Sequence, residues 1–244
     1  MSALVSRRLP ALLIVLLILG CSGTKVTTKA SAQAAKYPVR TIALIPFETI
    51  ATPQIVDASG PAFSVPSGAR RSDMAASGSQ ASDQYVRRTQ VVPPAAGEKI
   101  TELVWAKLKA KSGLRVLSPN EARLAVRDLS GGAAAEAPPA HTIAQRLGAD
   151  AALSGKVLVY QERVGSRLGA DPPAAVGFEV KLVAPDGMVL WEGNYYEKQR
   201  PMTEDFLGFI QRSGGFVTAD ELAAYGASEL AEAFPYGGAA GGAP

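Results

Sequence analysis

Apolar and polar residues alternate most regularly in the last third of the chain. The apolar positions of a first segment are Val176, Phe178, Val180 and Leu182. The pattern returns over 188–196, with Val189, Trp191 and Tyr195 expected on one side. Pro185-Asp186-Gly187 separates the two segments, and its glycine tolerates the positive φ that a tight turn needs. The pattern therefore predicts an antiparallel β-hairpin.

Shorter periodic segments predict the rest of the fold. Strands are expected at 40–47, 114–117 and 151–160, and helices at 97–113, 118–129, 140–147 and 218–234. Two of these helices begin with a capping box, Ser118-Pro119-Asn120-Glu121 and Thr218-Ala219-Asp220-Glu221. The order of elements predicts an α/β (α+β) fold: a mixed sheet of about five strands, a C-terminal antiparallel hairpin, and helices packed on the sheet.

Three segments lack such a pattern. Residues 21–39 are mostly Ser, Thr, Ala, Lys and Gln, a composition that predicts a flexible tether. Residues 48–96 form a long insertion within a single domain at 40–234; so long a connection is either functional or disordered, and we favour disorder. The Gly/Ala/Pro tail at 235–244 is also expected to be disordered.

The first twenty residues have the pattern of a secretory signal. Arg7 and Arg8 precede an apolar run at 11–19, which is about half the length of a membrane-spanning helix. The residues 18–21, Ile-Leu-Gly-Cys, resemble the lipobox of bacterial lipoproteins, in which cleavage leaves the cysteine as the lipidated first residue. The alternative is an ordinary signal peptide with an accidental cysteine, but Cys21 is the only cysteine of the chain.

The resemblance to a lipobox implies a place in the cell. Cys21 would carry fatty acyl chains, of which two or more hold a protein firmly in a bilayer. Ser22 follows the cysteine where the family has Asp in proteins kept at the inner membrane. We therefore expect a lipid-anchored protein of the outer membrane, with signal peptide 1–20 removed and the domain facing the periplasm.

The charge pattern does not favour nucleic acid as a partner. The formal net charge of +3 falls to +1 when Arg7 and Arg8 leave with the signal. A polyanion-binding protein has clustered Lys and Arg, and here only the pairs Arg70-Arg71 and Arg87-Arg88 come close.

Few residues have the arrangement of a catalytic site. His141 is the only histidine, and we interpret it as exposed or capping. Acylation of Cys21 would leave no thiolate, and we find no nucleophile elbow, Walker loop or dinucleotide fingerprint. The carboxylate pairs Glu204-Asp205 and Asp220-Glu221 lie near helix starts, where negative charge is favoured. We expect no enzyme activity, metal or cofactor; a carboxylate-based peptidoglycan hydrolase is the alternative.

The folded region resembles the periplasmic lipoproteins related to CsgG, LpoB and the N-terminal domain of TolB. The residues that carry the resemblance are 42–47, 147–157, 178–182, 186–193 and 218–222. The resemblance implies a lipoprotein whose periplasmic domain binds protein partners in cell-envelope assembly, synthesis or secretion. A ring-forming secretion component of CsgG type, a homo-oligomer, is an alternative. Residues 161–175 are too polar to form two membrane-spanning strands, so we do not expect a CsgG-type pore.

Overall fold

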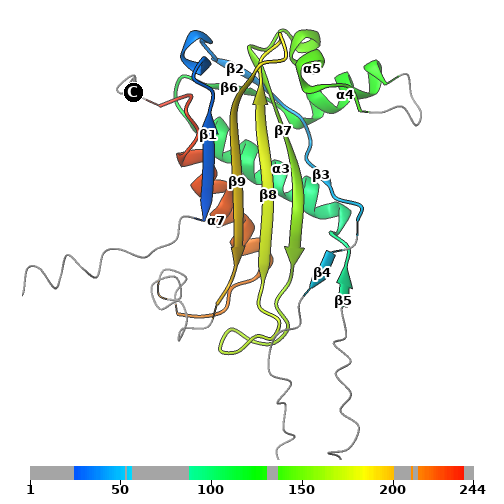
Figure 1. Cartoon of the computed structure of the whole chain (residues 1–244), viewed down its shortest axis with the longest axis vertical. Helices are drawn as coiled ribbons and strands as arrows, with labels where there is room; N and C mark the ends of the chain where they lie inside the picture. Colours follow the sequence, from blue (N-terminus) through cyan, green and yellow to red (C-terminus); the bar gives the residue numbers. More distant parts are fainter. Residues whose placement is uncertain are drawn as a thin grey trace, which may run out of the picture.

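A mixed sheet with helices on both faces forms the body of the molecule (Figure 1). The computed structural model describes residues 25–52, 54–56, 88–130, 137–200, 210 and 214–238. Within them, seven strands follow the order β1-β9-β8-β7-β2-β6, with β3 paired to β7. The strands are β1 Val26–Ala30, β2 Thr41–Leu44, β3 Glu48–Thr49, β6 Arg115–Leu117, β7 Ala151–Gln161, β8 Ala175–Val183 and β9 Val189–Lys198. The mixed α+β fold is confirmed, with more strands than the five expected.

Two of the described helices lie on each face of the sheet, and the two pairs cover different strands. They are α3 Pro94–Lys109, α4 Pro119–Leu129, α5 Ala140–Leu147 and α7 Ala219–Glu232. Figure 1 shows α3 and α7 behind the sheet, where they cover the main core. On the other face, α4 and α5 pack over β2 and the start of β7. No helix of the described residues covers β8, β9 and β1 on that side, which we call the open face.

The predicted C-terminal hairpin is confirmed. Strands β8 and β9 pair antiparallel, and the alternating apolar residues of β8 are buried against α7. The ring centroids of Phe178 and Tyr195 lie 5.3 Å apart in this part of the core. The register shifts after Leu182, so Val189 is exposed and Leu190 is buried. A one-residue shift reverses the side to which a strand residue points, which is why Val189 departs from the expected side.

Both predicted capping boxes are present. Ser118 and Glu121 bond reciprocally at the start of α4, and Thr218 and Glu221 do so at the start of α7. The helix α5 ends at Gly148, which has a left-handed backbone (φ 60°).

The structure differs from the flexible tether predicted over 21–39. Strand β1 pairs antiparallel with β9, with Val26 opposite Tyr195, and a 3₁₀ turn at Ala34–Lys36 follows it. The β-branched residues of β1 favour an extended chain, and an edge strand exposed to solvent needs no apolar alternation. Lys25 adds an ion pair to the buried Glu197 (Nζ to Oε1, 3.2 Å). Cys21 and the signal peptide lie outside the described residues.

Parts of the predicted insertion and tail are also ordered. Strand β3 pairs with β7, and β4 (Gln54–Val56) pairs with β5 (Arg88–Gln90), so 48–56 and 88–96 are structured apart from residue 53, which is not described. Residues 57–87 lie outside the described residues, as do 239–244. Tyr236 packs against Phe234, and the Gly238 N–H donates to the Ser112 carbonyl (2.8 Å). In the described parts of the chain, no helix is both long and apolar enough to cross a membrane.

Candidate functional site

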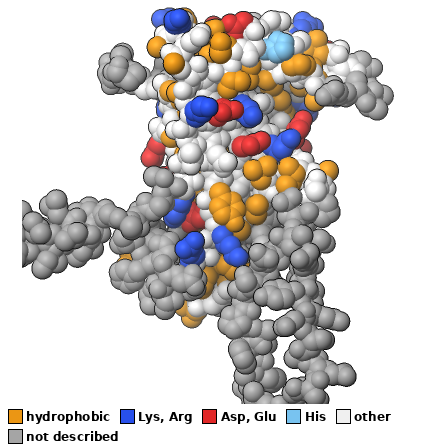
Figure 2. All heavy atoms as spheres, viewed as in Figure 1, with side chains coloured by type: hydrophobic (Ala, Val, Ile, Leu, Met, Phe, Trp, Pro, Cys, Tyr) orange, Lys and Arg blue, Asp and Glu red, His pale blue; other side chains and the backbone are white. Residues whose placement is uncertain are grey.

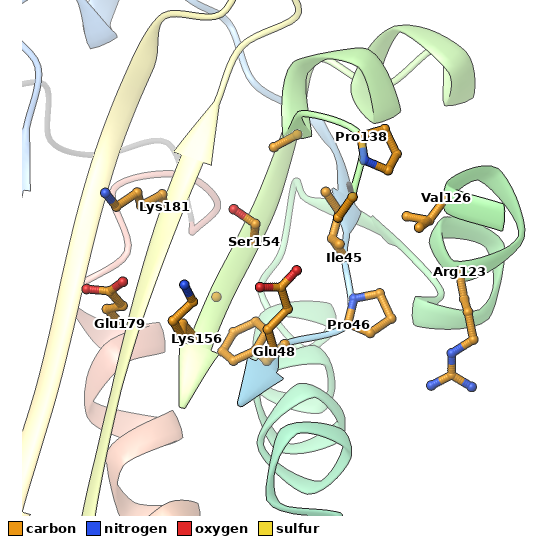
Figure 3. Close-up of a pocket in the computed structure, with 14 residues that line it drawn as sticks. Ile45, Pro46, Glu48, Arg123, Val126, Pro138, Ser154, Lys156, Glu179 and Lys181 are labelled. Atoms are coloured by element: carbon orange, nitrogen blue, oxygen red, sulfur yellow. The ribbon is translucent and has the colours of Figure 1, made fainter. Parts of the chain in front are cut away.

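A groove of about 580 Å³ lies where the chain leaves β2. Pairing with β7 is interrupted at Pro46 and Phe47, and the segment 45–48 runs between β7 and the pair α4–α5 (Figure 3). The Ile45 N–H still donates to the Leu153 carbonyl (2.9 Å), but two residues later the Phe47 N–H donates to Thr101 instead of to β7, and pairing with β7 resumes at β3. The pairing with β7 therefore has a gap at the point where the groove forms.

Contacts with α3 hold this segment in place. The Phe47 N–H donates to the Thr101 hydroxyl (2.8 Å), which in turn donates to the Gly97 carbonyl (2.7 Å). A Cβ at Gly97 would lie 2.5 Å from the Phe47 carbonyl oxygen, so only glycine permits this approach. On the sheet side, the Phe47 ring lies over Gly155, where a Cβ would be 2.5 Å from the ring. The groove wall is thus fixed by two close packing contacts at glycines.

The side of the groove toward the helices is apolar. It is formed by Ile45, Pro46, Val126, Pro138 and Ala140. These side chains come from the segment after β2, from α4 and from the start of α5. Arg123 of α4 lines the same groove and pairs with Glu98 (3.6 Å). An apolar wall beside polar groups is typical of a surface that buries part of a bound partner.

The side toward the sheet carries two rows of charged residues across neighbouring strands, which we call the charged rows. The first row is Glu48, Lys156 and Glu179, on β3, β7 and β8. The second row is Ser154, Lys181, Glu192 and Lys29, on β7, β8, β9 and β1. Neighbouring residues of a row are direct cross-strand partners, so each charged residue has one of opposite charge beside it. For example, Lys181 Nζ is 3.4 Å from Glu192 Oε1.

The charged rows extend the groove across the open face. Figure 3 shows Glu48, Lys156 and Glu179 along one side of the groove, and Figure 2 shows basic and acidic side chains alternating across the middle of this face. A second, shallower hollow of about 320 Å³ continues over β8, β9 and β1, where Thr27 and Asn194 line it. With three lysines and three glutamates, the rows carry no net charge.

The residues singled out from the sequence lie elsewhere. His141 is half-buried in the first turn of α5, whose N-cap is Pro139, so the histidine is not the cap. Asp220 accepts hydrogen bonds from Lys99 Nζ (2.6 Å) and from the Tyr160 hydroxyl, and these hold its pKa below the usual value. Glu221 belongs to the capping box, where the Thr218 N–H lowers its pKa.

Glu204 and Asp205 lie outside the described residues. Among the residues that are described, no group of three or more His, Cys, Asp and Glu side chains could hold a metal ion.

The groove residues were not identified as a site from the sequence. The alternation over β8 already places Glu179 and Lys181 on the polar side of the strand. Their cross-strand partners follow only from the sheet order, because β3 and β7 are separated by about a hundred residues.

No protein-family model and no curated protein matches the chain. Among solved structures, it is similar to a dodecameric PelC variant from Paraburkholderia phytofirmans, at 14% identity and a TM-score of 0.42, over 85% of this chain and 96% of that one. The LpoB C-terminal domain from Salmonella enterica matches at 13% identity and a TM-score of 0.34, over 76% and 93%. The lipoprotein GNA1162 from Neisseria meningitidis matches at 15% identity and 0.33, over 71% and 91%. At these scores, function has to be derived from the residues of this chain.

Proposed function

We propose that the chain is a non-enzymatic lipoprotein of the outer membrane, anchored by acylated Cys21, whose periplasmic domain binds a protein partner in cell-envelope assembly, synthesis or secretion. The lipobox-like residues 18–21, with the only cysteine of the chain, support the anchor. The groove and the open face support the binding of a protein.

The observation that carries the proposal is the apolar wall beside the charged rows. A protein segment in the groove would bury its apolar side chains against Ile45 and Val126, while its charged groups meet Lys156 and Glu179. Balanced charges of both signs select a partner by complementarity. The same balance provides no field that would attract a polyanion such as nucleic acid.

The charged rows also bear on the hydrolase alternative. Glu48 and Glu179 are the carboxylates nearest the groove floor, and Lys156 stands between them as the cross-strand partner of both. Each of the two glutamates thus has a lysine of opposite charge as its direct cross-strand partner, so the two carboxylates do not face each other across the groove. This arrangement therefore favours a role of the two glutamates in binding.

A photo-crosslinking amino acid at Val126, in the full chain expressed in its own cells, tests the proposal. We expect it to capture a defined protein, and the same probe at Lys107, exposed on the opposite side on α3, to capture none. Lys156→Glu places three glutamates side by side in the first charged row and should reduce the capture severalfold. Lys107→Glu is the matched control and should leave it unchanged.

The outcomes separate the candidate functions. Equal capture at Val126 and Lys107, or capture that Lys156→Glu does not change, would contradict binding in the groove. Capture of the chain by a second copy of itself would support the ring-forming alternative. Release of fragments from isolated peptidoglycan by the purified full chain, lost in Glu48→Gln, would support the hydrolase.

A further inference from the structure

The start of β1 limits how far the domain can stand from its anchor. Three residues separate Cys21 from Lys25, so the link has four Cα–Cα steps; a fully extended chain spans at most about 3.6 Å per step, and the link reaches roughly 14 Å. Lys25 is fixed to the sheet, because its carbonyl accepts from the Tyr196 N–H (3.1 Å) and its ammonium pairs with Glu197. If Cys21 is acylated, as the proposed function requires, the bilayer lies close to this end of the sheet.

The same end of the sheet carries the loop between β7 and β8. Strand β1 is antiparallel to β9, and its first residue, Val26, pairs with Tyr195, three residues before β9 ends, so β1 begins toward the end of the sheet where β7 ends and β8 begins. Figure 1 shows the loop, residues 162–174, at the lower end of the molecule, with α4 and α5 at the other end. The N-terminal end of β1 is therefore directed toward this loop.

The loop presents apolar side chains to the outside. Leu168 is 90% exposed and Val164 60% exposed. Backbone hydrogen bonds hold the loop. Within it the Ser166 N–H donates to the Gly169 carbonyl (2.8 Å), and from the segment before α7 the Phe216 N–H donates to the Arg167 carbonyl (2.8 Å). An ordered loop that holds a leucine in water at its tip loses conformational entropy without burying apolar surface in return. Contact with a bilayer would bury that surface.

Basic and aromatic side chains lie at the same end of the sheet. Arg167 is exposed in the loop, Lys198 and Arg200 are exposed at the end of β9 and just beyond it, and Tyr196, 54% exposed, precedes them on β9. Protein surfaces that lie at the membrane interface typically combine apolar residues such as leucine and valine with tyrosine, arginine and lysine.

The carboxylates of the same end are mostly engaged within the fold. Glu162 accepts from the Ala219 N–H (3.0 Å), Glu197 pairs with Lys25, and Glu221 belongs to a capping box that Arg163 and Arg167 face. Asp171 is the further exposed carboxylate of the loop. The outward-pointing charge of this end is therefore mainly positive, which complements lipid phosphates.

We propose that this end of the sheet rests on the phospholipid bilayer in which Cys21 is anchored. Leu168 and Val164 reach the boundary of the acyl chains, and Arg167, Lys198 and Arg200 contact the lipid phosphates. The loop is too polar to span the membrane, so it lies in the interface. The sheet then stands upright on the membrane, with the groove between α4, α5 and β7 turned toward the periplasm.

A probe at Leu168 in the full mature chain tests this orientation. Acylation blocks Cys21, the only cysteine, so Leu168→Cys provides a single thiol for an environment-sensitive fluorophore. The chain is reconstituted in vesicles of phosphatidylethanolamine and phosphatidylglycerol that contain a spin-labelled lipid as quencher. We expect severalfold stronger quenching than for Leu124→Cys, a leucine 58% exposed on α4 at the other end. Val164→Cys gives a second position for the probe.

Further variants decide between the outcomes. Arg167→Glu combined with Lys198→Glu should lower the quenching at Leu168 severalfold and leave that at Leu124 unchanged. Equal quenching at Leu168 and Leu124 in a chain shown by intact mass to be acylated overturns this inference and leaves the proposed function standing. An unmodified Cys21 in the native protein overturns the anchor and this inference together.

Discussion

Gly97 determines how closely α3 approaches the segment that lines the groove. Its missing side chain leaves room for the Phe47 carbonyl, while Thr101 one turn later receives the Phe47 N–H. A Cβ at this position would meet a backbone atom, which no side-chain rotation can relieve. The position of Glu48, the next residue, follows from that of Phe47.

Gly97→Ala is therefore expected to destabilise the protein. Alanine is favoured over glycine in a helix by about 1 kcal/mol, whereas overpacking a buried contact costs about 1–3 kcal/mol. Because the backbone must move, we expect the overpacking cost to exceed the gain in helix propensity. The variant should have a lower urea midpoint of unfolding and weaker crosslinking from the groove. Gly169→Ala, with no atom within 4 Å of the new Cβ, is the control. An unchanged or higher midpoint for Gly97→Ala would contradict this account.

Single residues were predictable from the sequence where their role is local. The capping boxes at Ser118 and Thr218 involve partners three residues away, so the sequence alone predicts them correctly. Gly97 gave no such signal, because its role depends on Phe47, fifty positions earlier. The exposure of Leu124 on α4 likewise depends on the packing of the whole fold, in which the helix buries Ala122 and Ala125 against its neighbours.

At the level of elements, β1 is the longest of the strands that the sequence pattern did not predict, the others being the short strands β3, β4 and β5. The hairpin β8–β9 was predictable since its two strands are adjacent and one side is buried. Strand β1 pairs with β9 across more than 160 residues and is exposed along most of its length. Neither apolar alternation nor a nearby turn marks such a strand.

The hydrogen-bond pattern of β1 gives a matched pair of proline variants. Tyr196 donates to Lys25 and Ser31 donates to Leu190, so the N–H groups of alternate residues between them, Thr27 included, face β9. Thr27→Pro removes one of these donors and should lower the free energy of unfolding by on the order of 1 kcal/mol. Thr28→Pro, whose N–H faces away from β9, should be tolerated.

Limited trypsin digestion measures the release of β1. Lys25 and Lys29 lie within the paired segment, and their cleavage requires it to leave the sheet. We expect faster cleavage in Thr27→Pro than in Thr28→Pro or the native chain. Equal rates in the two proline variants would mean that the register of β1 on β9 differs from the one described.

At the scale of the whole molecule, the pairing of β1 replaces a long tether by a short link. The fold class was predictable, because the order of helices and strands is set by local patterns. The proposed orientation on the membrane was not, since it rests on where β1 joins the sheet and on which loop lies at that end. With only three residues between Cys21 and Lys25, the proposed contact of the loop with the bilayer would be an intramolecular event of high effective concentration.

A longer link between Cys21 and Lys25 tests whether the anchor determines the orientation of the domain on the membrane. Inserting about twelve Gly and Ser residues between Cys21 and Lys25 adds a flexible span of roughly 20 Å. Acylation and the fold should be unchanged, but the effective concentration of the loop at the bilayer falls with linker length. We expect weaker lipid quenching of the probe at Leu168, while crosslinking from Val126 in the groove persists. Quenching that is independent of linker length would mean that the loop binds the bilayer without help from the anchor.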